Sequence, residues 1–285
     1  MPDSPVSVRE LCIQILACGE LEAKLASVFG ADGSLLPDFE PGPPLVFARP
    51  ARVPGLEMRG GAKRLPRPGE LSDPRSRIAC LRRFAHHELM AVELFAWALL
   101  LWPDAPPELR RGWCLALADE QRHCRMYLDR LRAHGEDLGG EPLSDYFWKH
   151  AAAIRVHARG PSAFLAAIGL TLEQASLDFT LIYAEAFRRG GDEESARASE
   201  IVHADERRHV RLAAEWLARL APAEEDELTA YRRSVPFPLG AARAKGRSFN
   251  TEARRASGLS EALIEHVRTA RPENERRPGR ADSRA

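Results

Sequence analysis

Two short segments of this chain share one pattern of acidic, basic and imidazole side chains. Residues 118–125 read Ala-Asp-Glu-Gln-Arg-His-Cys-Arg, and residues 204–211 read Ala-Asp-Glu-Arg-Arg-His-Val-Arg. In each copy a glutamate precedes a histidine by three positions. On a helix this spacing places a carboxylate and an imidazole on one face, one turn apart. Such a pair can bind a transition metal through oxygen and nitrogen.

A single glutamate in an apolar segment precedes each copy. Glu88 lies 32 residues before Glu120, and Glu173 lies 33 residues before Glu206. Two Glu-x-x-His pairs and two further glutamates are the ligand set of di-iron and di-manganese carboxylate sites in four-helix bundles. One Glu-x-x-His pair alone is usually a solvated helix face, but two near-copies at matching intervals favour a metal site. The predicted ligands are Glu88, Glu120, His123, Glu173, Glu206 and His209.

The chemistry of these six side chains indicates which metal they would hold. Four carboxylates carry four negative charges, which balance two divalent ions. A mixture of carboxylate oxygen and imidazole nitrogen suits iron or manganese and leaves positions open for oxygen or substrate. The expected cofactor is therefore two iron ions, with manganese or a mixed manganese–iron pair as the alternatives.

The neighbours of the predicted ligands also repeat. An aspartate precedes each glutamate of the pairs and an arginine precedes each histidine: Asp119 and Asp205, and Arg122 and Arg208. A ligating imidazole usually donates its other N–H group to a carboxylate, which sets its tautomer. We expect Asp119 to orient His209, and Asp205 to orient His123. The arginines would neutralise these two aspartates.

Other side chains near the pattern have weaker claims on the site. Glu93 and Asp178 each lie five positions after a lone glutamate, about 140° around the helix from the ligand face, so we expect structural ion pairs there. Thr180 lies two turns after Glu173 and is a candidate for the oxygen pocket, with a structural role as the alternative. His203 lies one turn before Glu206 but has no counterpart in the first half.

Four further residues read as structural. We expect Phe95 to be a core side chain. Of His86 and His87, one should lie in the core and one at the surface. The Cys124 thiol, beside a predicted ligand, should be inert packing.

Charge, cysteine content and hydropathy limit the kinds of partner and compartment that this protein is expected to have. The 285 residues carry 41 basic and 41 acidic side chains, so no net field favours nucleic acid or an anionic membrane. The five cysteines are odd in number and form no Cys-x-x-Cys pair, which favours reduced thiols in the cytoplasm. The N-terminus lacks the features of a signal peptide, and the most apolar run, 95–102, is too short to cross a bilayer.

Proline, glycine and apolar periodicity divide the chain into four parts. Residues 1–75 should hold one amphipathic helix over 6–29 and a Pro/Gly-rich arm over 30–75 packed on a bundle. A four-helix bundle is predicted over 76–221, a C-terminal extension over 222–268 and a disordered basic tail over 269–285. The four bundle helices are expected at 76–101, 107–134, 161–189 and 192–220.

The lengths of the connections predict the topology of these helices. The first and second helices are joined by a short link, as are the third and fourth, so each pair forms an antiparallel hairpin. A long connection over 135–160 lets the third helix start at the end where the first one starts. This is the one-crossover arrangement of ferritin-like bundles, an all-α fold.

With these motifs placed, the chain resembles the ferritin-like superfamily, and within it most a bacterial family of ferritin-like domains of unknown function. The resemblance rests on His87-Glu88-Leu-Met-Ala-Val-Glu93, Trp102-Pro-Asp-Ala-Pro-Pro, Asp119-Glu-x-Arg-His123, Leu172-Glu-Gln-Ala-Ser-Leu-Asp178, Asp205-Glu-x-x-His-Val210, Gly240-Ala-Arg-Ala-Lys-Gly and Phe249-Asn-Thr-Glu-Ala-Arg-Arg-Ala-Ser-Gly258. One departure, Gln174-Ala-Ser-Leu-Asp in place of Ala-Arg-Gly-Leu-Asp, leaves Glu173 intact. The Asp-Glu-x-Arg-His pattern is also similar to that of multicomponent monooxygenases and acyl-carrier desaturases, which activate oxygen at a di-iron centre.

The resemblance implies a metal site but no reaction, so three functions stay open. The first is an oxygen-activating oxidoreductase, a hydroxylase or oxidase, that uses dioxygen or peroxide and an external electron donor on a small substrate. The second is ferritin- or rubrerythrin-like iron handling or peroxide scavenging, which the long extensions and the lack of a Cys-x-x-Cys pair disfavour. The third is a hydroxylase of transfer RNA. The basic residues between Arg243 and Arg284 would suit it, although such a terminus is more often solvated.

Overall fold

The computed structural model describes residues 5–59 and 64–272. Over these residues helix is the only regular structure, and two isolated backbone bridges join Phe29 to Leu35 and Met58 to Leu143. The prediction of an all-α protein is confirmed. The chain divides into two compact units, which are described separately. Unit 1 holds Met1–Ala151 and Ile182–Val202, and unit 2 holds Ala152–Leu181 and His203–Ala285.

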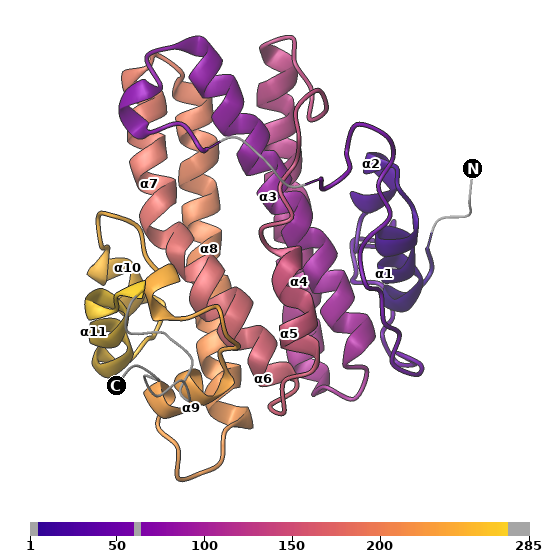
Figure 1. The fold of residues 1–285 in the computed structure, drawn as a ribbon. Coiled ribbons are helices and arrows are strands. Elements are labelled where there is room, and N and C mark those ends of the chain that lie inside the picture. The colour runs from indigo at the N-terminus through magenta and orange to yellow at the C-terminus, as the bar shows by residue number, and fades with distance from the viewer. Residues whose placement is uncertain (1–4, 60–63, 273–285) are drawn as a thin grey trace, which may run out of the picture. The chain divides into compact units, whose positions relative to one another are not determined.

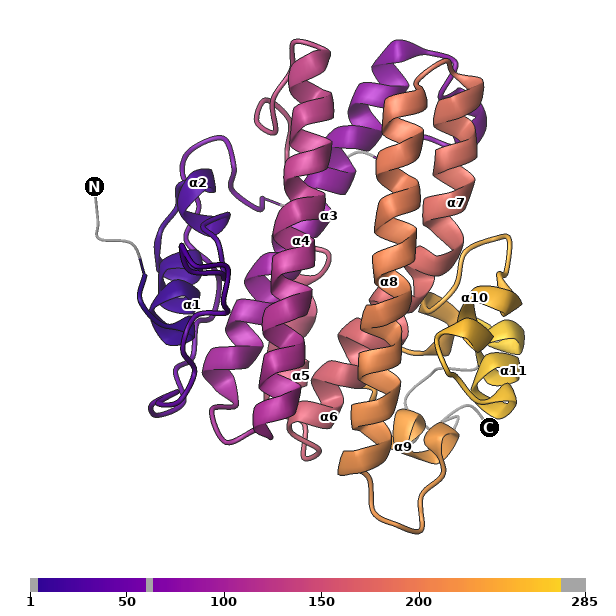
Figure 2. The ribbon, with the colours of Figure 1, turned by 180° about the vertical axis from the view of Figure 1, so that it is seen from behind.

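A long helical hairpin forms the centre of unit 1. Helix α3 (Pro74–Leu101) and helix α4 (Pro107–Ala133) pack side by side, joined by a short turn (Figures 1 and 2). The Asp73 carboxylate accepts a hydrogen bond from the Arg75 backbone N–H and caps the start of α3. Proline stands first in both helices, where its missing N–H is harmless. Gly135, with φ +74°, ends α4. Both helices agree with the predicted boundaries to within a few residues.

The N-terminal helix is broken, so the prediction of one helix over 6–29 is wrong. Helix α1 (Val8–Ala17) and helix α2 (Leu21–Lys24) are separated by a short interruption around Gly19. The arm runs against this interruption, and the Val53 N–H donates to the Gly19 carbonyl at 3.3 Å. A Cβ atom on Gly19 would lie 2.8 Å from the Val53 nitrogen. A distant segment of the chain therefore lies against the break between the two helices.

The arm is irregular over residues 30–59 and 64–73, apart from a short 3₁₀ turn, Pro68–Glu70, and α3 begins at Pro74, two residues earlier than predicted. Hydrogen bonds attach the arm to α3 and α4. The Leu45 N–H donates to the Leu100 carbonyl at 3.0 Å, and the Trp97 indole N–H donates to the Phe47 carbonyl at 3.1 Å. The Arg110 guanidinium on α4 binds both oxygens of Asp38, at 2.6 and 2.7 Å.

Two helices contribute residues to both units. Helix α7 (Gln174–Arg189) ends and helix α8 (Glu193–Leu220) begins within unit 1. The turn between them contains Gly191, with φ +79°. Arg188 pairs with Glu200 of α8 at 2.6 Å. The predicted end of the third helix at the glycine pair and the predicted extent of the fourth are confirmed.

The predicted third helix is not regular throughout. Its first part, in unit 2, holds a short helix α6 (Pro161–Phe164) and then a π-helix, Leu165–Glu173, before α7 begins. The Gln174 N–H donates to the Gly169 carbonyl, five residues back, as a π-helix requires. The sequence indicated the helix but not this wider turn.

The C-terminal extension folds into short helices. Unit 2 contains helix α9 (Glu227–Ser234), a 3₁₀ turn (Ala241–Arg243), helix α10 (Thr251–Ala256) and helix α11 (Glu261–Thr269). A further short helix, α5 (Ala151–Arg155), precedes α6. Most of the predicted disordered tail, residues 273–285, lies outside the described residues.

Two helical stretches are long and apolar enough to cross a membrane by length and composition. These are Pro74–Leu101 and Pro161–Arg189, whose most apolar windows are 78% and 72% buried within the protein. A core helix of a soluble protein passes the same test, so these stretches are weak evidence for a membrane protein.

Candidate metal centre

Unit 1 brings together three of the predicted ligands. Glu88 comes from α3, and Glu120 and His123 come from α4. Each offers a ligand atom within 4.8 Å of those of the other two. The His123 Nδ1 atom lies 3.7 Å from Glu120 Oε2, and both of these side chains are buried, while Glu88 is half-buried. The α3–α4 hairpin thus forms the first carboxylate–imidazole triad.

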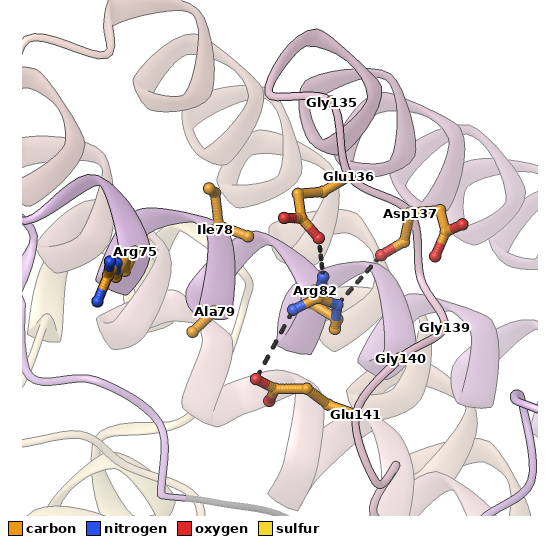
Figure 3. A pocket seen from close by; sticks show the side chains of 10 residues that line it. All are labelled: Arg75, Ile78, Ala79, Arg82, Gly135, Glu136, Asp137, Gly139, Gly140 and Glu141. Atoms are coloured by element: carbon orange, nitrogen blue, oxygen red, sulfur yellow. Dashed lines mark hydrogen bonds and ion pairs between the residues drawn. The ribbon is translucent and has the colours of Figure 1, made fainter.

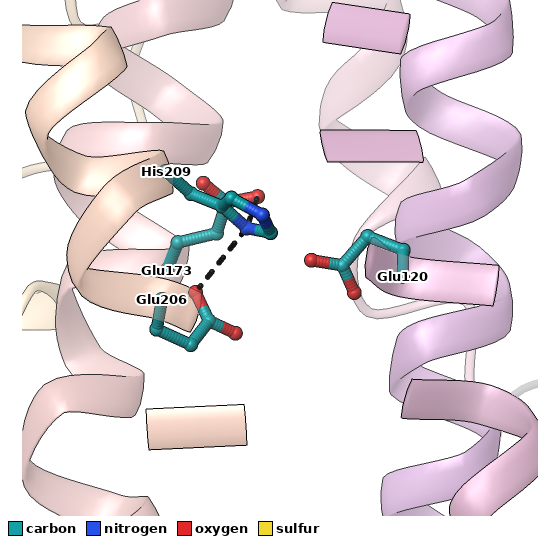
Figure 4. Close-up of side chains that lie close together, drawn as sticks. All are labelled: Glu120, Glu173, Glu206 and His209. Carbon is teal, nitrogen blue, oxygen red and sulfur yellow. Dashed lines mark ion pairs between the residues drawn. The ribbon is translucent and has the colours of Figure 1, made fainter. Parts of the chain in front are cut away.

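Unit 2 brings together the other three. Glu173 is the last residue of the π-helix, and Glu206 and His209 lie one turn apart on α8. All three are buried, and their ligand atoms also lie within 4.8 Å of one another. The His209 Nδ1 atom is 3.9 Å from Glu173 Oε1 and 3.9 Å from Glu206 Oε2. In Figure 4 these two glutamates turn toward His209.

The donor atoms of each triad fit a transition metal. Iron, manganese or zinc binds carboxylate oxygen and imidazole nitrogen at roughly 2 Å, so two ligands of one ion lie about 3 to 4 Å apart. The nitrogen-to-oxygen distances in both triads, 3.7 and 3.9 Å, agree with this separation. Carboxylates buried this far cost several kcal/mol unless a cation compensates them. Each triad therefore has donor atoms of a kind and spacing that could hold a metal ion.

The repeated aspartates and arginines pair within their own helices. The Arg122 guanidinium lies 2.9 Å from the Asp119 carboxylate, and Arg208 lies 2.6 Å from Asp205. In both pairs the arginine is largely exposed and the aspartate more buried. The expected hydrogen bonds from His209 to Asp119 and from His123 to Asp205 join residues of different units, and they stay predictions.

The Glu93 carboxylate is the centre of a buried ion cluster in unit 1. It accepts hydrogen bonds from the Arg52 guanidinium at 2.7 and 2.7 Å and from the Trp148 indole at 3.1 Å. The Lys24 ammonium lies 3.0 Å away. Burial lowers the pKa of Lys24, and the charge of Glu93 opposes this shift. The prediction of a structural ion pair at Glu93 is confirmed.

The Asp178 carboxylate likewise forms a buried ion pair in unit 2. The Arg254 guanidinium binds both of its oxygens, at 2.7 and 3.0 Å, and Arg254 and Asp178 are both buried. The backbone N–H groups of Gly246 and Asn250 also donate to it, at 2.8 and 2.7 Å. The second predicted ion pair is therefore confirmed, and it fastens the C-terminal extension to α7.

Thr180 and His203 contact each other. The Thr180 hydroxyl donates to the Ser176 carbonyl at 2.6 Å, so His203 Nδ1, 3.0 Å from Thr180 Oγ1, is the donor between them. The pKa of His203 is lowered, mainly by burial and then by the charge of Arg207, and Asp178 opposes the shift. A neutral imidazole with its proton on Nδ1 follows. Whether Thr180 borders an oxygen pocket stays a prediction.

The remaining candidates near the first triad are structural. His86 is fully buried, and burial lowers its pKa to about 2. His87 is half-buried and stacks on the Phe147 ring at 5.3 Å, so neither imidazole lies at an open surface. Burial raises the pKa of the Cys124 thiol, whose sulfur lies 3.3 Å from the Ala85 carbonyl. Phe95 is buried, as expected for a core side chain.

A separate surface cavity of about 530 Å³ lies in unit 1, between the start of α3 and the turn over 135–141 (Figure 3). Arg82 pairs with two of its acidic side chains. The Arg82 guanidinium binds Glu136 at 2.7 Å and lies 3.9 Å from Glu141, and it also donates to the Asp137 carbonyl. Arginine, acidic side chains and glycine line the cavity, which is a poor donor set for a transition metal.

Three residues form hydrogen bonds in or beside the π-helix that ends at Glu173, and the sequence did not predict them: Thr171, Tyr231 and Arg254. Arg254 lies within the Phe249–Gly258 segment that carries the family resemblance, and this was the available signal. Thr171 is an isolated hydroxyl in an otherwise apolar run, and Tyr231 carries no local signal. Their partners lie about 60 to 80 residues away along the chain, which no local pattern reveals.

One known protein family matches most of this chain. The family described as "Protein of unknown function (DUF455)" matches residues 21–265, a range that includes both triads and most of the extension. No curated protein and no solved structure gives a significant match. The match extends over most of the chain, so the protein belongs to the DUF455 family.

Proposed function

We propose that the two triads are the halves of one dinuclear metal centre in a ferritin-like bundle. The observation that carries this proposal is that each unit gathers one lone glutamate and one Glu-x-x-His pair, with ligand atoms within 4.8 Å of one another. Neither half alone offers more than three protein ligands. Together they would supply the six-residue set that di-iron and di-manganese carboxylate proteins use.

The proposed cofactor is a pair of iron ions, with manganese or a mixed pair as alternatives. Four carboxylates match the charge of two divalent ions, and the oxygen and imidazole donors suit these metals. When bound, such a pair supplies the redox chemistry for activating dioxygen or peroxide. The protein residues hold and orient the ions, and burial of five of the six ligands keeps bulk water away.

The function that these features support best is an oxidoreductase, a hydroxylase or oxidase, acting on a small substrate with an external electron donor. The half-buried Glu88 is the least enclosed of the six ligands. The first triad is therefore the better candidate for the side from which oxygen or substrate approaches. The ion pairs around Glu93 and Asp178 attach the helices that carry the ligands to neighbouring segments, and loss of one partner would leave a buried charge uncompensated.

Metal analysis tests the proposal directly. After anaerobic loading with Fe²⁺ and removal of excess metal, we expect two iron ions per chain by elemental analysis. The reduced, loaded protein should then consume dioxygen. Folded protein that retains only a trace of iron would overturn the proposed centre. Turnover of peroxide without oxygen consumption would instead favour a scavenging role.

A further inference from the structure

The ligand Glu173 stands at the end of an uncommon element. Residues Leu165–Glu173 form a π-helix, whose hydrogen bonds join residues five apart instead of four. Each hydrogen-bonded ring holds one more residue than in an α-helix, which changes the rotation of the residues that follow. The direction of the Glu173 carboxylate therefore depends on this segment keeping its π form. Long π segments are rare, so something must stabilise this one.

One stabilising contact comes from helix α9. The Thr171 hydroxyl donates to the Ala166 carbonyl at 2.7 Å, which spans five residues and matches the π pattern. The Tyr231 hydroxyl lies 2.9 Å from Thr171 Oγ1. Since a hydroxyl has one hydrogen, Tyr231 is the donor in this second bond. Both side chains are fully buried, so water cannot replace either partner.

A second contact comes from helix α10. The Arg254 guanidinium, anchored on Asp178, lies 3.4 Å from the Gln174 carbonyl, directly after the ligand. Its Nε–H also donates to the Gln174 amide oxygen at 3.1 Å, and the amide nitrogen donates to the Leu170 carbonyl at 2.6 Å, in the amide orientation that satisfies both neighbours. Arg254 thus binds the carbonyl and the amide of Gln174, the residue after the π-helix, and the amide connects it to Leu170 within the π-helix.

Helix α8 leaves the π-helix little room. A Cβ atom on Gly169 would lie 2.3 Å from the Ala213 Cβ, so only glycine allows this approach. Ala213 lies on the helix that carries Glu206 and His209, four residues after the histidine. The π-helix is therefore constrained by three contacts within unit 2, and two of them come from the C-terminal extension.

We propose that Tyr231 and Arg254 are positioning residues for Glu173. The C-terminal extension holds the π-helix in its wide turn and thereby sets the direction of the ligand carboxylate. This inference rests on the proposed role of Glu173 as a metal ligand. It assigns to the extension a function in metal binding beyond covering unit 2.

Replacement of one hydroxyl tests the inference with little risk to the fold. In Tyr231→Phe we expect cobalt to bind one of its two sites about 10-fold more weakly, the lower end of the range for outer-shell changes. Titration of the metal-free full-length chain with Co²⁺ measures this, and the visible ligand-field spectrum should change with it. Hydrogen exchange of the amides in 165–174 should become faster. Thr171→Val should give the same changes, and the double variant should add nothing.

A matched control separates positioning from general damage. Tyr183→Phe also removes a phenol that donates one hydrogen bond, at 2.7 Å to the Pro66 carbonyl in unit 1. It should leave the cobalt spectrum, the affinity and the exchange of 165–174 unchanged. Arg254→Lys keeps a charge beside Asp178 but loses the planar fork, so its spectrum should shift in the same direction as that of Tyr231→Phe.

The possible outcomes are distinct. If the natural protein binds two cobalt ions and Tyr231→Phe matches it in affinity and spectrum, the positioning role is wrong and the metal centre stands. Weaker binding with unchanged spectrum and exchange would also overturn the inference, because the π-helix would not be involved. If the natural protein binds neither cobalt nor iron, the proposed centre fails and the inference fails with it.

Discussion

The two units anchor their extensions at equivalent positions of the repeat but with different partners. Glu93 and Asp178 each lie five residues after a lone glutamate, and each is buried against an arginine. In unit 1 the N-terminal segments deliver two cations, Arg52 and Lys24, to one carboxylate. In unit 2 the C-terminal extension delivers one arginine and two backbone N–H groups. Both units therefore have a buried carboxylate at this position. Its cationic partners come from the N-terminal segments in unit 1 and from the C-terminal extension in unit 2.

The ligands that these anchors serve also differ. Glu88 lies in the regular helix α3 and is half-buried, whereas Glu173 ends a π-helix and is buried. A regular α-helix is the common form of the chain, whereas a π-helix is rare, and here the C-terminal extension contacts it at Thr171 and at Gln174. The comparison therefore indicates that unit 2 depends more on its extension than unit 1 does.

The largest expected effect tests whether the two triads act together. Glu120→Ala removes a ligand of the first triad, and His209→Ala removes one of the second. If the triads form one centre, either change should lose most bound iron from both sites, measured by elemental analysis. Helical circular dichroism should stay near that of the natural protein, because burial and not metal supplies most of the stability.

Two substitutions of the same chemistry serve as controls for the ligand variants. Glu108→Ala on α4 and His157→Ala in unit 2 change residues outside the triads and should retain both ions. Loss of a single ion in each ligand variant would show two independent sites. Loss of helix content would make the metal structural and contradict the expected result.

The next largest effect is expected from loss of the arginine that pairs with Asp178 or with Glu93. Arg254→Met leaves Asp178 buried with backbone donors alone, and losing one partner of a buried ion pair typically costs about 3–5 kcal/mol. Arg52→Met should cost less, because Lys24 still compensates Glu93. The free energy of unfolding in urea measures both. Equal losses would mean that the second cation in unit 1 contributes nothing.

A smaller effect concerns the paired aspartates next to the ligands. Asp119→Asn and Asp205→Asn should each weaken iron binding by about 10- to 100-fold, if each carboxylate orients an imidazole. Asp104→Asn, an exposed residue of the α3–α4 turn, is the control. Affinities equal to that of the control would remove the orienting role and leave the six ligands untouched.

The smallest expected effect is on acid stability, with one carboxyl from each unit. Burial would raise the pKa of Asp192, but hydrogen bonds from Ser195 and the charge of Arg130 outweigh it and lower the pKa. Arg159 and then Arg233 lower the pKa of Glu225. A lowered carboxyl pKa contributes stability above its unfolded value, here near 4, which is lost as the pH falls through the folded value.

The measurement for this prediction is the urea midpoint at pH 7 and at pH 3. Asp192→Asn and Glu225→Gln should be less stable than the natural protein at pH 7, and the difference should shrink at pH 3. A difference that is the same at both pH values would show that these ionised carboxyls do not contribute through their shifted pKa.

The sequence by itself determined the long helices α3, α4 and α8 and the pairing of side chains within α4 and α8. Proline at the first position marks the start of α3 and of α4, Pro103 follows the end of α3, and Gly135 follows the end of α4. These signals act within about one turn. A spacing of three residues places Glu120 beside His123, and Glu206 beside His209, in any helix. Glu88 lies 32 residues before Glu120, about the length of one helical hairpin. This interval was enough to predict that Glu88 lies near Glu120 and His123.

The tertiary structure alone decided how these elements are supported. The residues around Gly19 carry no signal that Val53 lies against it in the folded protein. The apolar sequence before Glu173 likewise gives no sign that it forms a π-helix. Arg254 reaches Asp178 across 76 residues, and Arg52 reaches Glu93 across 41. Helix periodicity and caps are short-range effects, whereas a buried charge takes whichever partner the packing of distant segments brings within about 3 Å. The acids could therefore be recognised from their positions, but their partners depended on the folded chain.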